Sequence, residues 1–156
     1  MKNFVKFAVM SAMLAAPLPA FAVTGDVQFG ATVSNTCAIT VGAPGVLTAN
    51  VGQTSLASTN AGGSAGTATI VATSANYTVG VDQPTAWQAG FPTGGDTAVT
   101  FAATYSAAGD TTVASTANNN ALATGTTNVS VNLSATKSSG SFPTGTYAAI
   151  VVLRCE

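Results

Sequence analysis

The stretch VTGDVQFGATVSNTCAITV, residues 23–41, alternates apolar and polar side chains with unusual regularity. Successive side chains of a strand point to opposite faces, so an extended chain with this pattern has one apolar face. From position 27 onward the odd-numbered residues are apolar with the exception of Asn35: Val27, Phe29, Ala31, Val33, Cys37, Ile39 and Val41. A strand of this kind needs a partner that covers its apolar face.

Residues 1–22, which precede this stretch, have the pattern of a secretory signal peptide. Lys2 and Lys6 are followed by the apolar run FAVMSAMLAA, by two prolines and by the sequence Ala-Phe-Ala that ends at Ala22. This order predicts cleavage after Ala22 and export of the chain. A membrane anchor is the alternative, but a spanning helix needs about 20 apolar residues and this run is roughly half as long.

The remaining 134 of the 156 residues are enough for one domain with a hydrophobic core. They carry two cationic and five anionic side chains, a net charge of −3. Without a basic patch, nucleic acid and anionic lipid are poor candidates as partners. No later apolar run is long enough to span a membrane, so we expect no membrane insertion.

The chain contains two cysteines, Cys37 and Cys155, and no histidine. An even number of cysteines in an exported protein favours a disulfide. Two free buried thiols are the alternative. Metal binding by the pair is disfavoured, since no histidine is present to complete a site.

Period-two alternation recurs at 77–82, 99–105 and 129–135, and turn-rich segments separate these stretches. The mature chain shows no helical repeat of apolar residues, so the sequence predicts an all-β fold, most simply a two-sheet sandwich of about seven strands. The composition of 111–126 leaves open whether that segment is a loop or a weak edge strand.

The last predicted strand, TYAAIVVLRC at 146–155, is apolar on both faces. Such a strand is expected to be covered on both sides or to lie beside something that covers it. One face carries four residues and continues to Cys155: Tyr147, Ala149, Val151 and Leu153. Cys37 likewise continues the apolar face of the first stretch, so both cysteines fall on core-facing positions, as a disulfide between the first and last strands requires.

Three segments, taken together and in this order behind a signal peptide, resemble the subunits of chaperone–usher pili and the related spore-coat-U-like pilins. VQFGATVSNTCAI at 27–39 resembles an N-terminal donor strand followed by a strand that bears a cysteine. VGQTSLASTNAGGSAG at 51–66 is similar to the segment that follows in many pilins, and FPTGTYAAIVVL at 142–153 resembles the opening of the last strand. The family usually pairs its first cysteine with a nearer one than Cys155.

The resemblance implies an immunoglobulin-like β-sandwich, residues 36–156, that lacks its final strand. A periplasmic chaperone would first fill the resulting groove, and the extension 23–35 of the next subunit would then replace it. The resemblance assigns the inserted side chains to Val23, Val27, Phe29, Ala31 and Val33, and the groove edge to the last strand with Tyr147, Ala149, Val151 and Leu153.

The partners implied are identical or related pilin subunits, the chaperone and an outer-membrane usher. The chain would pass through the periplasm to a fimbria on the cell surface or to the exterior, and its receptor stays unknown. The main alternative is a self-contained exported sandwich, such as a surface-coat, biofilm-matrix or adhesin protein, in which the first strand pairs within its own domain.

An enzyme is a third class, and the sequence argues against it. No histidine can act as a general base, and the acidic residues are scattered over turns and strand ends. Asp96 and Asp110 follow glycines and are typical of turns rather than of calcium sites. Trp87 with Phe91 could stack on a sugar, but a lone tryptophan in a sandwich is more often a core residue. We therefore expect no catalysis, cofactor or metal.

Overall fold

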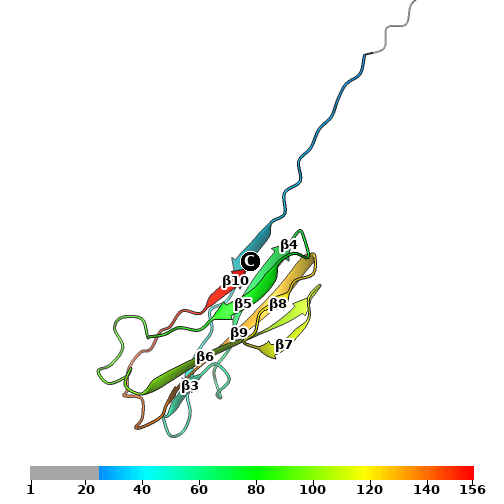
Figure 1. Ribbon diagram of the computed structural model, residues 1–156. Helices are drawn as coiled ribbons and strands as arrows, with labels where there is room; N and C mark the ends of the chain where they lie inside the picture. Colours follow the sequence, from blue (N-terminus) through cyan, green and yellow to red (C-terminus); the bar gives the residue numbers. More distant parts are fainter. Residues whose placement is uncertain (1–24) are drawn as a thin grey trace, which may run out of the picture. The chain divides into compact units, whose positions relative to one another are not determined.

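The computed structural model describes residues 25–156, so the predicted signal peptide and Val23 lie outside the described part. Residues 33–156 form one compact unit (Figure 1). Within the described residues all regular structure is β. The ten strands are β1 (Cys37–Val41), β2 (Thr48–Ala49), β3 (Ser55–Ala57), β4 (Gly66–Ala72), β5 (Thr78–Asp82), β6 (Val99–Gly109), β7 (Val113–Thr116), β8 (Asn120–Ala121), β9 (Gly125–Lys137) and β10 (Val152–Cys155).

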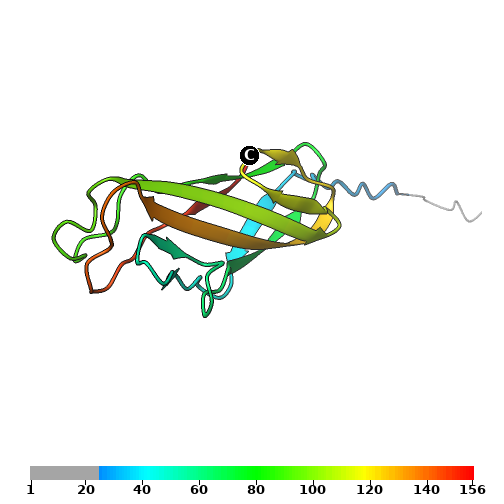
Figure 2. The same cartoon turned by 90° about the horizontal axis from the view of Figure 1, so that it is seen from below.

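The larger sheet is built around the 13-residue strand β9. On one side β9 pairs with β6 from Val99↔Lys137 to Gly109↔Thr127, and the two long strands lie side by side in Figure 2. On its other side β9 pairs first with β4 and then with β3. The strands β1, β2 and β7 lie outside β4, β3 and β6, and every pairing is antiparallel.

The smaller sheet has the order β10-β5-β8. β10 pairs with β5 from Val152↔Asp82 to Cys155↔Val79, again antiparallel. β10 is therefore an edge strand among the described residues, and its outer side has no neighbour in the sheet.

One hydrophobic core lies between the two sheets, because alternate residues of the long strands turn inward. In β6 the side chains of Phe101, Ala103, Tyr105 and Ala107 are buried, while those between them are more exposed. The Tyr105 hydroxyl lies 3.0 Å from the carbonyl oxygen of Val79 in the opposite sheet. The all-β prediction is thus confirmed, with two antiparallel sheets that share a core, as in a β-sandwich.

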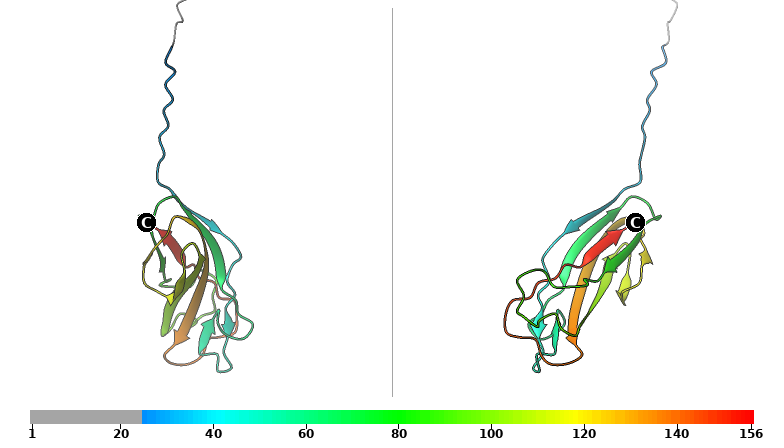
Figure 3. Two further views of the ribbon diagram at one scale, coloured as in Figure 1. Left: turned by 90° about the vertical axis from the view of Figure 1, so that its right-hand side faces the viewer. Right: turned by 60° about the vertical axis from the view of Figure 1, so that its left-hand side comes forward.

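The disulfide between Cys37 and Cys155 is also confirmed. It joins the start of β1 to the end of β10, with the two Cα atoms 6.3 Å apart and 118 positions apart in the sequence. Because β1 belongs to the larger sheet and β10 to the smaller one, the bond connects the two layers at one end. In Figure 3 the red β10 lies close to the cyan β1 at this point.

Most predicted strands are present, and two differ in length. The stretches 77–82, 99–105 and 129–135 fall on β5, β6 and β9, and the undecided segment 111–126 contains the short strands β7 and β8. The last predicted strand pairs only at 152–155, and the first is a strand only from Cys37. Alternation reports which side chains share a face, whereas strand pairing also requires a neighbour for the backbone.

Candidate functional site

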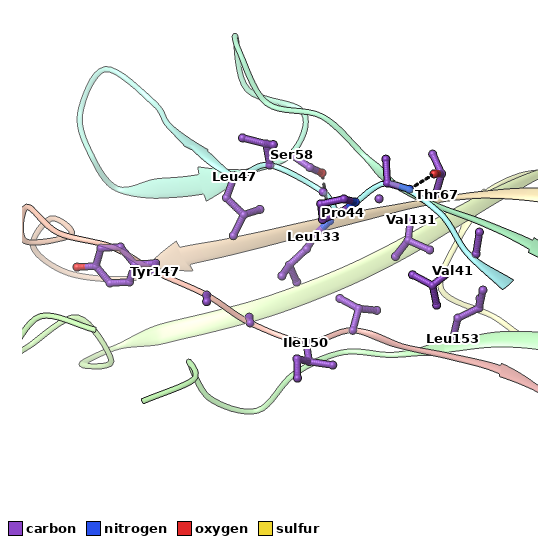
Figure 4. A pocket seen from close by; sticks show the side chains of 18 of the residues that line it. Val41, Pro44, Leu47, Ser58, Thr67, Val131, Leu133, Tyr147, Ile150 and Leu153 are labelled. Carbon is purple, nitrogen blue, oxygen red and sulfur yellow. Dashed lines mark hydrogen bonds between the residues drawn. The ribbon is translucent and has the colours of Figure 1, made fainter. Parts of the chain in front are cut away.

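A groove of about 670 Å³ lies between the start and the end of the compact unit. One wall is formed by residues 39–47, the other by residues 147–153, and β9 contributes to the floor (Figure 4). The lining residues are Ile39, Val41, Ala43, Pro44, Gly45, Val46, Leu47, Ser58, Gly66, Thr67, Ala68, Val131, Leu133, Tyr147, Ala148, Ala149, Ile150, Val151 and Leu153. Apart from Ser58, Thr67 and Tyr147, these residues carry no polar group in the side chain, so the groove suits an apolar occupant.

Among the described residues, the backbone hydrogen bonds of the first wall all lie on one side. β1 pairs with β4, and the chain beyond β1 continues this contact through Gly42 N–H to Thr67 O at 2.8 Å and Thr67 N–H to Ala43 O at 2.9 Å. Further along, Val46 and Ser64 exchange two backbone hydrogen bonds of 2.8 and 3.0 Å. These contacts hold the wall against β4 and leave its other edge toward the groove.

The second wall has a backbone edge without partners. Glu156 and Thr78 exchange hydrogen bonds of 2.7 and 3.1 Å, and Ala148 O accepts one from Gln88 N–H at 2.7 Å. Because backbone groups alternate sides along a strand, even-numbered residues here face β5 and odd-numbered residues face the opposite edge. Accordingly, Tyr147, Ala149 and Val151 form no backbone hydrogen bond within residues 25–156.

The same odd-numbered residues turn their side chains inward. Tyr147, Ala149, Val151 and Leu153 are half-buried and pack against the core, whereas Ile150 and Val152 between them are exposed. From the floor, Val131 and Leu133 of β9 also line the groove. The residues predicted for the last strand thus present both apolar side chains and free backbone groups along one line.

A disulfide holds one end of the groove, and a cluster of aromatic rings holds the other. Beyond Ile39 and Leu153 the walls are joined by the Cys37–Cys155 disulfide. At the other end Tyr147 packs against Trp87 and Phe142, with ring centroids 5.0 and 5.4 Å apart. The Tyr147 hydroxyl donates a hydrogen bond to Pro143 O at 2.8 Å. Desolvation by burial raises the pKa of Tyr147 above its ordinary value, which favours the protonated hydroxyl that donates this bond.

Trp87 is a core residue, and its indole is not presented for sugar stacking. Its side chain is buried, its Nε1–H donates to Gly95 O at 3.2 Å, and its ring lies 4.8 Å from that of Phe101. Asp110 has the turn role that its position predicts, since its carboxylate accepts a hydrogen bond from Thr126 N–H at 2.6 Å.

Lys137 is a structural residue that sequence reasoning missed. Its side chain is buried, and Nζ donates to the carbonyl oxygens of Gly94 at 2.8 Å and Thr97 at 2.7 Å. The ammonium also lies 5.3 Å from the centroid of the Phe142 ring. These bonds fasten the loop that supports Tyr147. The sequence did carry one sign of this burial, because Lys137 has an odd number and the odd-numbered residues of β9 face inward.

Within residues 25–156, the residues predicted to act as donor strand have no strand partner, and Val23 lies outside this described part. Residues 25–36 form no regular structure, and the side chains of Val27, Phe29 and Val33 are 76, 94 and 90% exposed. Ala31 is exposed as well. The apolar segment and the apolar groove are therefore both without a partner in the described part of the chain.

The described residues contain no group of three or more side chains arranged to hold a metal ion. No helix among residues 25–156 is long and apolar enough to cross a membrane. A scan against protein-family models matched none of them, and searches of curated proteins and of solved structures found no significant match.

Proposed function

We propose that this chain is a structural subunit of a surface fimbria and that it polymerises by strand insertion. Residues 23–33 of one copy would enter the groove between 39–47 and 147–153 of the next. The observation that carries the proposal is the free backbone edge at Tyr147, Ala149 and Val151 beside an apolar groove, in a chain that also has an exposed apolar segment.

Insertion would give both the groove and the exposed segment the partner that each lacks within residues 25–156. An added strand forms main-chain hydrogen bonds with the free edge, and its alternate side chains enter the groove. Burial of Val27, Phe29 and Val33 is worth roughly 1.5–3 kcal/mol for each side chain before the cost of ordering the segment. This gain explains why a chain would carry an apolar strand outside its own core.

The order of the strands supports an immunoglobulin-like sandwich that lacks one strand. In that fold, strands A, B, E and D form one sheet and C, F and G form the other. Here β1-β4-β9-β6 follow the order of the first sheet, and β5 and β10 take the places of C and F. The inserted segment would occupy the place of G, at the outer edge of β10.

The same features suit the predicted route of the chain. A free strand edge next to an apolar groove promotes aggregation. A periplasmic chaperone would cover this edge in transit, and an outer-membrane usher would receive the subunit for assembly. The disulfide fits an oxidising compartment outside the cytoplasm. We propose no catalytic role and no cofactor.

A pair of substitutions on neighbouring residues tests the proposal. Phe29→Asp places a charge on the apolar face of the segment, whereas Gln28→Asp places it on the polar face. We expect the mature wild-type chain and Gln28→Asp to form polymers in sedimentation velocity and electron microscopy, and Phe29→Asp to stay monomeric, because a buried unpaired carboxylate is strongly unfavourable.

A synthetic peptide of residues 23–35 completes the test. Added to the Phe29→Asp chain, it is expected to raise the thermal unfolding midpoint, and the same peptide with Phe29→Asp is expected to have no effect. If Phe29→Asp polymerises like wild type, or if wild type is a monomer that the peptide does not stabilise, the proposal is rejected. The second result would favour the self-contained coat, matrix or adhesin protein.

A further inference from the structure

We infer a single register for the inserted strand, which rests on the proposed strand insertion and names its specificity-determining pairs. Phe29 of one copy lies opposite Ala149 of the next, Val27 lies opposite Val151, and Ala31 lies opposite Tyr147. The groove thereby selects its donor by the order of large and small side chains.

Backbone geometry reduces the possible registers to a few. Both pairings in the smaller sheet, β10 with β5 and β5 with β8, are antiparallel, so a strand added outside β10 is taken to be antiparallel as well. Directly opposite residues in such a pair lie on the same face of the sheet. The apolar side chains of the segment and the inward side chains of the groove wall are both odd-numbered, so odd residues must meet odd residues and the register shifts only in steps of two.

Side-chain size then selects one of these registers. Read toward the disulfide, the wall presents Tyr147, Ala149, Val151 and Leu153. Read in the opposite direction, the segment presents Ala31, Phe29, Val27 and Gly25. In the inferred register the largest wall residue meets alanine, the smallest meets phenylalanine, valine meets valine, and leucine meets glycine. The summed volumes of the first three pairs are therefore nearly equal, and the pair of leucine and glycine is smaller.

The wall has room for a phenyl ring at one place. Between Tyr147 and Ile150 it carries only the two alanines 148 and 149, and Pro44 and Leu133 lie across the groove from this stretch (Figure 4). Tyr147 does not easily move away to make a second place, because its ring packs on Trp87 and its hydroxyl bonds to Pro143 O.

The neighbouring registers fit poorly for opposite reasons. Moving the segment two residues toward the disulfide sets Ala31 against Ala149, which leaves a void, and crowds Phe29 against Val151. Moving it two residues the other way sets Phe29 against the fixed ring of Tyr147. Both shifts also lose the pairing of Leu153 with Gly25.

Four cysteine pairs, introduced two at a time into the mature chain, test the register. Directly opposite residues of a hydrogen-bonded antiparallel pair have Cα atoms about 5.5 Å apart, within disulfide range, whereas diagonal neighbours are about 7–8 Å apart. The pairs in register are Phe29→Cys with Ala149→Cys and Val27→Cys with Val151→Cys. The matched pairs out of register are Phe29→Cys with Val151→Cys and Val27→Cys with Ala149→Cys.

After mild oxidation, non-reducing gels are expected to show a ladder of cross-linked oligomers for the two pairs in register. The cross-linked fraction should exceed that of the two matched pairs by about tenfold. Peptide mapping by mass spectrometry should identify the new bond and show Cys37 still joined to Cys155 in every variant.

The outcomes separate the register from the strand insertion itself. A ladder from the matched pairs alone, or equal ladders from all four, overturns the register while leaving strand insertion in place. Polymers without any of the four cross-links also overturn the register. Monomers in all variants and in wild type overturn the proposed function on which the register rests.

Discussion

Tyr105 joins the two sheets through its hydroxyl group. The residue is fully buried, and the hydroxyl oxygen lies 3.0 Å from the carbonyl oxygens of both Val79 and Asn118. It also accepts a hydrogen bond from Asn120 Nδ2 at 2.7 Å. The hydroxyl has one proton, so it donates to one of these carbonyl oxygens at a time while it accepts from Asn120. A buried polar group that loses its partner keeps the full cost of desolvation, so removal of this hydroxyl is costly.

Tyr105→Phe is therefore expected to lower the free energy of unfolding by about 1–3 kcal/mol. Urea unfolding in the monomeric Phe29→Asp chain would measure this loss without interference from assembly. Tyr77→Phe is the matched control, because the Tyr77 hydroxyl has no hydrogen bond within residues 25–156 and its loss should change stability little. Equal effects of the two substitutions would contradict the role given to Tyr105.

At the scale of elements, the disulfide connects two strands that no hydrogen-bond ladder joins. β1 pairs with β4 and β10 pairs with β5, so the covalent bond between Cys37 and Cys155 is the link between these strands at the end of the groove. It closes most of the compact unit into one loop, which restricts the unfolded chain strongly.

Replacement of both cysteines by serine is expected to lower the free energy of unfolding by up to about 4–5 kcal/mol in the chain-entropy account. Denaturant unfolding in the Phe29→Asp background would measure the loss. Reduction of the unchanged cysteines by dithiothreitol serves as the control and should produce a loss of similar size. An unchanged unfolding midpoint in both experiments would contradict this contribution.

The two terminal strands show where a sequence pattern overstates pairing. Residues 146–155 are apolar on both faces, which predicts cover on both sides, yet only 152–155 belong to a sheet. Residues 147–151 have β5 and its loop on one side and the groove on the other. These residues have the apolar side chains of a covered strand, but no neighbouring strand pairs with their backbone on the groove side. The use of residues 23–33 as that neighbour stays a prediction.

At the scale of the whole molecule, both cationic side chains among residues 25–156 are held in local contacts. Lys137 is buried under its loop, and Arg154 forms ion pairs with Asp82, at 2.9 Å, and with Glu156. The groove and the exposed segment are both apolar where they would meet. Assembly should therefore depend on apolar burial and main-chain hydrogen bonds rather than on electrostatic attraction.

We accordingly expect polymerisation to be nearly independent of salt. Raising sodium chloride from about 0.05 to 0.5 M shortens the Debye length several-fold and weakens steering between exposed charges. Light scattering should show assembly rates that change by less than about twofold over this range. A fall of an order of magnitude would indicate that charged surfaces, and not the groove, control association.

The sequence by itself determined which side chains share a face. Alternation locates β5, β6 and β9, and the parity shared with Cys155 places Tyr147, Ala149, Val151 and Leu153 on the inward face of the last strand. Parity also set both cysteines on core-facing positions, and composition predicted a core role for Trp87. These properties are local, because the pleat of a strand fixes the direction of each side chain from its neighbours in the chain.

Only the tertiary structure decided which backbone edges are paired and which are free. The partner of β10 on one side, the groove on its other side and the carbonyl groups around Lys137 are all contributed by residues distant in the sequence. No local period encodes such contacts, because they depend on how separate strands pack after the loops between them close.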